Sequence, residues 1–495
     1  MLSIFLDTSA PPCPAPFNMA AYVLGTGAPD QLALRVISAE GSSDWTYGAM
    51  RDQVARLASA LVDQGLTPGD RVLMRIRNSA EFPLVYLAAL WAGLVPVPAS
   101  AGLTVPEITA IAAELRPAMV IRSGAVSIPD GPDCPILDYT ALVGETAMAP
   151  LMGDPNRPAY IIYTSGTSGK PRGVIHAHRA VWARRMMWDG WYGLTPHDRV
   201  LHAGAFNWTY TLGTGLMDPW ACGATALIPV EGTKASALPT LMVRYGATIF
   251  AAAPGVYRQM LREGPVTVPT LRHGLSAGEK LPDRIRAAFR ASTGCAVHEA
   301  LGMSECSTFI SGSPAKPAAE GSSGRPQPGR HVAVLDSEGT PVARHTPGTL
   351  AIHRDDPGLM LGYLGAEDET AARYIGDWFV TGDTVEMAQD DSITYLGRDD
   401  DMMNAGGFRV SPLEVEAALA RHPGIAEAAV VEHRVKADVT VIAAYYTGPV
   451  ALLDDDLTAF TAANLARYKC PRIFTHIDAL PKSGNGKINR KALRQ

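Results

Sequence analysis

The sequence has few cysteines and no pair of them at metal-ligand spacing. Its six cysteines lie far apart among 495 residues, and no Cys-x-x-Cys motif occurs. This pattern excludes the usual zinc sites and argues against a disulfide framework. We therefore expect reduced thiols in a cytoplasmic protein.

The sequence also lacks an excess of charge of either sign. Charged residues make up 19% of the chain, and the formal net charge is -6. Nucleic-acid binding requires a basic patch or stripe, so no nucleic-acid partner is expected. The one dense basic cluster comes at the end of the sequence, between Lys482 and Arg494. Taken alone, such a cluster indicates a solvated tail.

Segments that target or cross membranes are scarce as well. No Lys or Arg occurs between Met1 and Leu34, so the positive region of a secretory signal is missing. The uncharged run from Phe82 to Ala99 is about long enough to span a bilayer, but one glycine and three prolines interrupt it. We predict instead a buried helix to about Ala92, a short strand at Leu94–Pro98, and no membrane partner.

Helical and strand-like patterns alternate through most of the chain. Tyr47–Gln64 carries apolar residues at helical spacing, and Arg71–Ile76 is typical of a strand. Further strands are predicted at Ala118–Ile121, Arg199–His202, Ala224–Leu227 and Thr248–Ala252. This alternation predicts an α/β fold with parallel sheets, followed by a β-rich section that runs to about Gly397.

A compact charged stretch, Arg398-Asp399-Asp400-Asp401, marks a change in composition. The residues after it contain two helical and two strand-like segments, enough for a small α+β domain. We therefore predict a large N-terminal domain over residues 1–397 and a small C-terminal domain over residues 398–495.

One segment carries most of the functional information. Residues 160–174 read Tyr-Ile-Ile-Tyr-Thr-Ser-Gly-Thr-Ser-Gly-Lys-Pro-Arg-Gly-Val, a strand-like run that enters a loop of hydroxyls, glycines and one lysine. Glycines let backbone N–H groups approach an anion closely, and hydroxyls and a lysine add donors and charge. The loop therefore suits polyphosphate. It is not a P-loop, because Pro171 occupies the position of the magnesium-binding Ser or Thr.

This segment closely resembles the signature loop of the adenylate-forming superfamily, which includes acyl- and aryl-CoA synthetases, amino-acid-activating domains and luciferases. Other segments resemble the family in the same order along the chain. Ser276–Pro282 resembles the segment beside adenine, in a form similar to the benzoate-CoA ligase branch, and 302–305 resembles the Gly-x-Thr/Ser-Glu element. Residues 378–383 resemble Trp-x-x-Thr-Gly-Asp, and 480–490 resemble the element with the catalytic lysine.

The resemblance implies a role for each matched residue. Lys487 would be the catalytic lysine, Ser304 a phosphate contact, Glu305 the magnesium ligand, and Asp400 the hinge of a mobile C-terminal domain. Asp383 and Arg398 would bind the ribose, and Ala277, Gly278, Glu279 and Gly302 would line the adenine. The phosphate loop would comprise Thr164, Ser165, Gly166, Thr167, Ser168, Gly169 and Lys170.

The implied reaction uses ATP, magnesium and coenzyme A. The acid's carboxylate attacks the α-phosphate to give acyl-AMP and pyrophosphate, and the small domain then rotates so that the thiol of coenzyme A can take the acyl group. Mobile steps of this kind limit turnover in many enzymes. The partner is a small carboxylic acid, and a homodimer is left open.

By family position, the acyl pocket comprises Phe206, Asn207, Trp208, Tyr210, Ala252 and Ala253, with Ala277 and Gly302 beside them. Its aromatic residues favour a small aryl or short acyl group, although core packing explains Tyr210 equally well. Asn207 cannot pair with an α-ammonium group as a carboxylate does, and no carrier domain follows Lys487 within this sequence. Both observations argue against peptide-synthetase function. An adenylating enzyme with another acceptor, a luciferase-like oxygenase and a regulatory protein without turnover remain alternatives.

Overall fold

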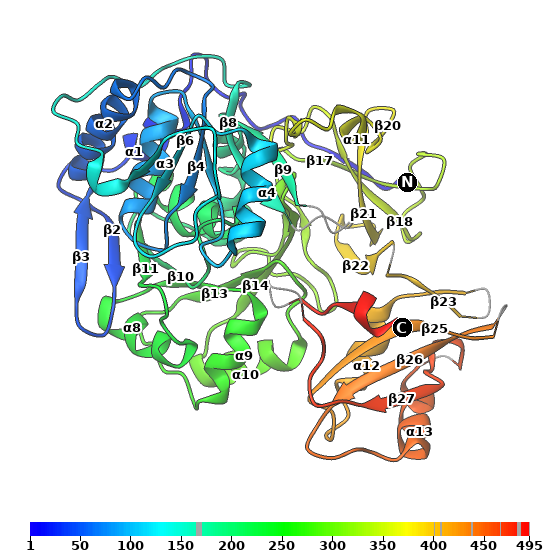
Figure 1. The fold of residues 1–495 in the computed structure, drawn as a ribbon. Coiled ribbons are helices and arrows are strands. Elements are labelled where there is room, and N and C mark those ends of the chain that lie inside the picture. Colours follow the sequence, from blue (N-terminus) through cyan, green and yellow to red (C-terminus); the bar gives the residue numbers. More distant parts are fainter. Residues whose placement is uncertain are drawn as a thin grey trace. The chain divides into compact units, whose positions relative to one another are not determined.

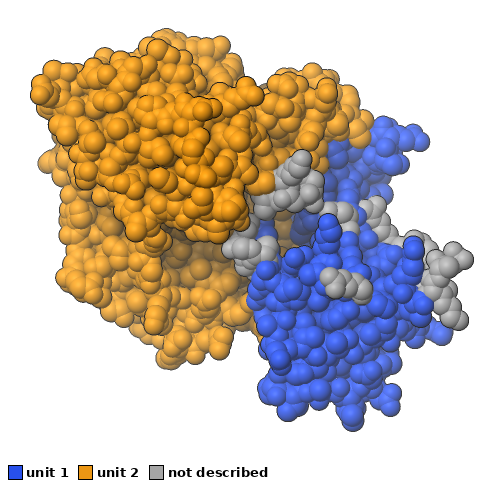
Figure 2. Space-filling model, in the orientation of Figure 1, with its two compact units in different colours: residues 1–4, 332–352, 378–495 blue, residues 5–331, 353–377 orange. Residues whose placement is uncertain are grey.

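The computed structural model describes residues 1–164, 171–399, 401–405, 408–436, 439–465, 467–482 and 487–494. They form two compact units (Figure 2). Unit 1 comprises residues 1–4, 332–352 and 378–495, and unit 2 comprises residues 5–331 and 353–377. The predicted α/β architecture is confirmed in outline. The predicted division at residue 397 stays a prediction, because strands on both sides of it belong to unit 1.

A nine-stranded sheet forms the centre of unit 2. Its core is parallel, since β10 pairs with β11 and β12, β11 with β2, and β13 with both β12 and β14. Antiparallel strands close both edges. In spatial order the strands are β16 (Arg325–Pro326), β15 (Ser307–Ser311), β14 (Val297–Met303), β13 (His273–Ala277), β12 (Ile249–Ala251), β10 (Arg199–His202), β11 (Thr225–Pro229), β2 (Leu32–Ile37) and β3 (Ser42–Thr46).

A second parallel sheet of unit 2 confirms the predicted interruption of the apolar run. Its spatial order is β5 (Val95–Pro98), β4 (Arg71–Arg75), β6 (Met119–Arg122) and β7 (Ile136–Asp138). The helix before β5, α3 (Glu81–Trp91), is buried at every position from Phe82 onward. A helix that is apolar all round requires such an interior position. Among the described residues, no helix is long and apolar enough to cross a membrane.

Helices connect and cover these sheets (Figure 1). The predicted helix at Tyr47–Gln64 is confirmed as α2, which packs against α3. α2 spans Tyr47–Asp63. The other helices of unit 2 are α1 (Met19–Gly25), α4 (Val105–Leu115), α5 (Ala180–Ala183), α6 (Thr209–Leu212), α7 (Asp218–Cys222), α8 (Leu238–Tyr245), α9 (Pro254–Arg262), α10 (Asp283–Thr293) and α11 (Glu367–Ala371).

A small antiparallel sheet of unit 2 presents the phosphate-loop segment. Its order is β19 (Gly362–Tyr363), β9 (Arg172–Ala177) and β8 (Pro158–Thr164). Thr164 at the end of β8 lies opposite Arg172 at the start of β9. The glycine-rich segment therefore connects two paired strands, and β19 extends the same sheet from a distant part of the chain.

Unit 1 contains most strands of one further sheet, the whole of a second, and a two-stranded hairpin. Strands β17 (His331–Leu335), β18 (Gly348–His353), β21 (Trp378–Met387) and β22 (Ile393–Arg398) follow one another in the first. Strands β25 (Glu427–Lys436), β26 (Val439–Thr447) and β27 (Ile473–His476) form the second, and helices α12 (Pro412–Leu419) and α13 (Asp454–Asn464) pack against it (Figure 1). The hairpin of β23 (Met403–Ala405) and β24 (Phe408–Val410) precedes α12.

Candidate active site

In unit 2, a hairpin turn presents Ser304 and Glu305 beside the phosphate-loop sheet. The turn joins β14 to β15, with Met303 opposite Ser307. The Tyr363 hydroxyl, from β19, donates a hydrogen bond of 2.7 Å to Glu305 Oε1. Tyr363 also lies opposite Val174 of β9. β9, the strand that begins after the phosphate loop, is therefore paired directly with the strand that carries Tyr363, and Tyr363 holds Glu305.

His176 holds the same turn from β9. Its Nε2 lies 2.8 Å from the carbonyl oxygen of Ser304. Burial lowers the pKa of His176 to about 4, so the ring is neutral near pH 7. A carbonyl oxygen only accepts, so Nε2 carries the proton in this arrangement. Tyr160 of β8 stacks on the imidazole with ring centroids 4.7 Å apart.

The chemistry of Glu305 suits magnesium. A carboxylate is a hard oxygen ligand, and proteins commonly hold this ion through one or two carboxylates together with substrate phosphates. Within the described part of the chain, no group of three or more His, Cys, Asp and Glu side chains could hold a metal alone. The arrangement therefore fits an ion shared with ATP. The Tyr363 hydrogen bond orients the carboxylate, and burial together with the Glu305 charge raises the pKa of the Tyr363 hydroxyl.

The predicted adenine contacts lie at the ends of adjacent strands. Ala277 is the last residue of β13 and lies opposite Ala300 of β14. Gly278 follows with φ +96°, a left-handed conformation that glycine adopts without strain. Gly302 is packed so closely against β15 that an added Cβ would lie 2.3 Å from the Ser307 carbonyl oxygen. The Ala277–Gly278 segment and the Gly302–Glu305 segment thus lie at the ends of the neighbouring strands β13 and β14.

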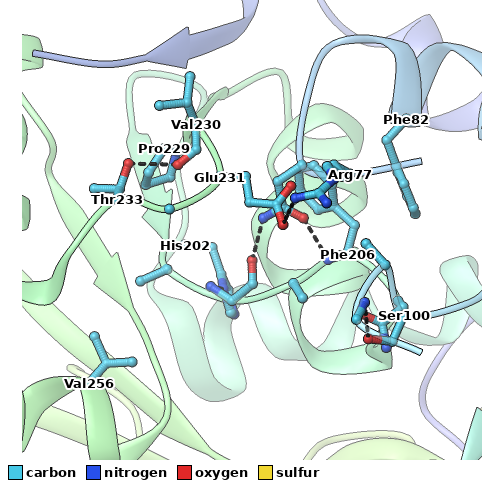
Figure 3. Close-up of a pocket in the computed structure, with 18 of the residues that line it drawn as sticks. Arg77, Phe82, Ser100, His202, Phe206, Pro229, Val230, Glu231, Thr233 and Val256 are labelled. Atoms are coloured by element: carbon cyan, nitrogen blue, oxygen red, sulfur yellow. Dashed lines mark hydrogen bonds and ion pairs between the residues drawn. The ribbon is translucent and has the colours of Figure 1, made fainter. Parts of the chain in front are cut away.

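A cavity of about 300 Å³ opens at the carboxyl ends of parallel strands from both large sheets of unit 2 (Figure 3). Phe206 and Asn207, two of the predicted acyl-pocket residues, are in its lining. The Asn78 amide fastens this segment, because its Nδ2 donates to the Gly204 carbonyl oxygen at 2.8 Å and its Oδ1 accepts from Phe206 N–H at 3.2 Å. Arg77 and Glu231 form an ion pair of 2.7 Å in the lining.

The other predicted acyl-pocket residues lie outside this cavity's lining, which does not contain Trp208, Tyr210, Ala252 or Ala253. The Tyr210 hydroxyl donates to the Leu275 carbonyl oxygen at 3.2 Å, and its ring stacks on Trp191. These contacts fit the core-packing role that the sequence left open for Tyr210, and the acyl-pocket roles of all four residues stay predictions.

Five histidines of unit 2 are buried and neutral. Burial lowers the pKa of each to about 3 or 4. In His202, which lines the cavity, Nδ1 accepts from Gly204 N–H at 3.0 Å, so the proton of the neutral ring is on Nε2. The five buried histidines are His176, His178, His202, His273 and His298.

In unit 1, Asp383 and Arg398 form one cross-strand pair. They lie directly opposite each other on β21 and β22, and Arg398 Nη1 is 3.1 Å from Asp383 Oδ1. The Tyr395 hydroxyl lies 3.5 Å from the same oxygen. Burial, followed by the Asp383 charge, raises the pKa of Tyr395. A buried carboxylate with donors on one side can accept hydrogen bonds from the hydroxyls of a bound ribose.

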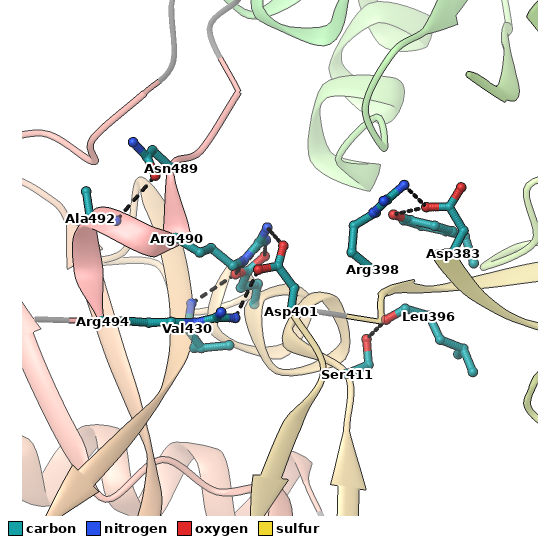
Figure 4. A network of polar contacts seen from close by, with 12 residues as sticks. Asp383, Leu396, Arg398, Asp401, Ser411, Val430, Asn489, Arg490, Ala492 and Arg494 are labelled. Carbon is teal, nitrogen blue, oxygen red and sulfur yellow. Dashed lines mark hydrogen bonds and ion pairs between the residues drawn. The ribbon is translucent and has the colours of Figure 1, made fainter. Parts of the chain in front are cut away.

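Lys487 is an exposed residue of unit 1 in a segment with defined neighbours. Ile488 forms an isolated β-bridge with Lys482, and Asn489 N–H donates to the Pro481 carbonyl oxygen at 2.8 Å. A short 3₁₀ helix, Arg490–Leu493, follows. Arg490 lies 2.8 Å from Glu416 of α12 and 3.5 Å from Asp401, which Arg494 also contacts (Figure 4).

Some predicted residues lie outside the described part of the chain. These are the hinge candidate Asp400 and six residues of the phosphate loop: Ser165, Gly166, Thr167, Ser168, Gly169 and Lys170. Their roles stay predictions. Conversely, the sequence patterns did not identify Tyr363, His176 or Asn78. Each contacts a segment more than 50 residues away, and none belongs to a motif.

Comparisons with known proteins identify the family of this chain. Residues 25–364 match the family described as AMP-binding enzyme, and residues 414–487 match the AMP-binding enzyme C-terminal domain. The chain is 29% identical to a benzoate–CoA ligase of Thauera aromatica, over 100% of this chain and 99% of that protein. It is 30% identical to a 3-hydroxybenzoate–CoA ligase of Aromatoleum sp. (strain CIB), over 97% and 96%.

A solved structure gives the same result. The crystal structure of a benzoate CoA ligase from Burkholderia xenovorans LB400 superposes with a TM-score of 0.83 at 28% identity, covering 97% of this chain and 100% of that one. With both domain families matched in order along the sequence, the chain belongs to the AMP-binding enzymes, among relatives that are acyl- and aryl-CoA ligases.

Proposed function

We propose that this protein is an ATP-dependent ligase that joins a small aryl carboxylic acid to coenzyme A through an acyl-AMP intermediate. The observation that carries this proposal is the position of Glu305. It is held by Tyr363 on the same small sheet whose other strands flank the phosphate loop. The strands that flank the predicted phosphate loop, and the carboxylate proposed to bind magnesium, thus belong to neighbouring elements of unit 2.

Adenylation is a displacement at phosphorus, in which catalysis consists largely of positioning and charge neutralisation. An oxygen of the acid's carboxylate attacks the α-phosphorus of ATP, and pyrophosphate leaves. Thr164 and the loop over residues 165–170 would hold the outer phosphates, and Glu305 would hold magnesium, which neutralises phosphate charge when bound. Ser304 would contact the phosphate, and Lys487 would bridge the carboxylate and the α-phosphate.

The nucleoside would be held by the remaining predicted residues. Asp383 and Arg398 would bind the ribose hydroxyls, and Gly302 and 277–279 would border the adenine ring. The small size of Ala277 and Gly278 leaves room for a flat ring.

Thioester formation requires a different geometry at the same carbonyl. The thiol sulfur of coenzyme A attacks the acyl carbon and loses its proton, and AMP leaves with the former carboxylate oxygen. Lys487 must withdraw to admit the thiol. We propose that residues 398–495 rotate about Asp400 between the two steps, as a mobile domain beside a core over residues 1–397.

The acid is proposed to be aryl because the similar proteins named above act on benzoate and 3-hydroxybenzoate. The cavity supports a small, uncharged acyl group, since its Arg77 and Glu231 side chains already neutralise each other. Asn207 in its lining offers a neutral amide.

All six cysteines are free thiols, which supports the proposed cytoplasmic location.

The test is AMP release, with and without coenzyme A, across benzoate, 3-hydroxybenzoate, 2-aminobenzoate, furoate, phenylacetate, acetate, butyrate, hexanoate and several amino acids. We expect coenzyme A-dependent AMP release with one or a few aryl acids. Pyrophosphate release that ignores coenzyme A would point to another acyl acceptor. Folded protein that binds ATP but turns over no acid would overturn the proposal.

A further inference from the structure

The turn that carries Ser304 and Glu305 has an unusual residue at its end. Met303 and Ser307 pair across the hairpin, so the loop between them has three residues. The residue that follows this loop and begins β15, Ser307, has φ +60°, a left-handed conformation in which glycine is favoured. A serine in this conformation is strained relative to glycine, so its side chain must be favoured by its surroundings.

The Ser307 hydroxyl is the partner of a buried guanidinium. Arg184 Nη1 donates to Ser307 Oγ from the segment after α5. Each residue of the turn is held from a different part of the chain: Ser304 by His176, Glu305 by Tyr363, Cys306 by Arg330 at 3.0 Å, and Ser307 by Arg184. The Arg184 contact is thus made to the residue at which the hairpin backbone is left-handed.

Arg184 is itself fixed on every side. Its Nε lies 2.8 Å from Asp218 Oδ1 and its Nη2 lies 2.6 Å from Oδ2, a bidentate pair whose side chains are 5% and 1% exposed. The Tyr192 hydroxyl donates to Asp218 Oδ2 at 2.6 Å, and Thr214 Oγ1 lies 3.4 Å from Arg184 Nη2. A planar guanidinium that makes two hydrogen bonds to one carboxylate has little freedom to move.

The local backbone is shaped around this group. The π-helical turn Gly213–Met217 joins α6 to α7 and precedes Asp218 at the start of α7. Turns of this kind are frequent at functional sites. A Cβ at Gly213 would lie 2.2 Å from the Arg184 guanidinium, so a larger residue would displace Arg184.

We infer that the buried Arg184–Asp218 pair, acting through the Ser307 hydroxyl, positions the Ser304–Glu305 turn for magnesium and ATP. This rests on the proposed function, in which Glu305 binds magnesium. Arg184 and Asp218 are positioning residues and do not touch the reacting atoms. Partners that orient a metal ligand commonly contribute 10- to 100-fold to metal affinity or activity.

Two variants test the inference. Ser307→Gly removes the hydroxyl but adopts the left-handed conformation more easily, so the turn's backbone is not strained. The double variant Arg184→Met with Asp218→Leu replaces the whole pair by apolar side chains, a change that proteins often tolerate without loss of stability. Arg272→Met is the matched control, because it removes an ion pair with Asp198 at the opposite, amino ends of the parallel strands.

Two readouts separate positioning from stability. One is the magnesium concentration for half-maximal pyrophosphate release, and the other is ATP binding by equilibrium dialysis with magnesium and with EDTA. We expect both test variants to raise the magnesium requirement by about 10- to 100-fold and to lose the binding advantage that magnesium confers. Arg272→Met should leave both unchanged, even where its thermal midpoint falls.

Glu305→Gln distinguishes failure of the inference from failure of the proposed function. If Glu305→Gln raises the magnesium requirement while Ser307→Gly and the double variant match the parent protein, the inference is wrong and the proposed function stands. If none of the three changes it, the magnesium role of Glu305 and the inference are both wrong.

Discussion

Replacing Glu416 by alanine should loosen the segment that carries Lys487. Arg490 donates to Glu416 through Nε at 3.1 Å and through Nη2 at 2.9 and 2.8 Å, and the two side chains are only 14% and 11% exposed. Removing one partner of a buried pair costs about 3–5 kcal/mol, because the other charge is left without compensation. Asp401 remains 3.5 Å from Arg490 Nη1, so we expect about 3 kcal/mol.

The catalytic consequence should differ between the two half-reactions. Arg490 begins the 3₁₀ helix only three positions after Lys487, so losing its anchor changes the placement of the lysine. Misplacement by about 1 Å can cost roughly 100-fold in rate. We therefore expect single-turnover pyrophosphate release to slow by about 10- to 100-fold. Thioester formation from supplied acyl-AMP, for which Lys487 must withdraw, should change much less.

Glu427→Ala is the matched control for this experiment. Glu427 pairs with Lys482 on the same C-terminal segment at 3.0 Å, but the pair is more exposed, at 21% and 34%. Exposed pairs contribute about 0–1 kcal/mol. Backbone hydrogen exchange of residues 487–494, which Glu416→Ala should accelerate by loosening the segment, should therefore change little in Glu427→Ala. The reasoning is refuted if Glu416→Ala exchanges like the control, or if both half-reactions slow equally.

Four further outcomes follow from the same geometry. Asp383→Ala should raise the KM for ATP by about 10- to 100-fold in initial-rate assays, because hydrogen bonds to a charged group contribute about 1.5–3 kcal/mol; an unchanged KM would contradict a ribose contact. Tyr363→Phe removes only the 2.7 Å hydrogen bond to Glu305 and should raise the magnesium requirement without a change in thermal midpoint. Lys487→Ala should abolish pyrophosphate release but spare thioester formation from acyl-AMP, and release at the parent rate would exclude its catalytic role. The five buried histidines stay neutral in the folded protein but gain protons in the unfolded chain below about pH 6.5. Denaturant titrations should therefore show the unfolding free energy falling from about pH 6.5 to about pH 4, by up to about 1.4 kcal/mol per pH unit for each histidine, and a constant value would contradict their neutrality.

Local patterns predicted several of the helices and strands. The prolines at 83, 96 and 98 and Gly93 were enough to divide an uncharged run into α3 and β5. The strand predicted at Arg199–His202 has the same bounds as β10. These elements follow from spacing and chain breakers, which act within a few residues and are therefore visible in the sequence.

The candidate site was only partly predictable, for a physical reason. Motifs give residues whose chemistry depends on their immediate neighbours, such as Glu305 beside Ser304. The side chains that orient them come from elsewhere: Tyr363 is 58 positions from Glu305, and Arg184 is 123 from Ser307. An isolated arginine or tyrosine gives no sequence signal for such a contact. The Asp383–Arg398 pair depends on the register between β21 and β22, which the sequence pattern also left undetermined.

The most direct test of the central claim follows an oxygen atom. If the acid's carboxylate attacks the α-phosphorus of ATP and the thiol then displaces AMP, one carboxylate oxygen must leave with AMP. Benzoate, or whichever aryl acid is preferred, would be supplied with both carboxylate oxygens as ¹⁸O, together with ATP and coenzyme A, and the products analysed by mass spectrometry. We predict one ¹⁸O in AMP and none in pyrophosphate. Label in inorganic phosphate or pyrophosphate, with unlabelled AMP, would contradict the acyl-adenylate route.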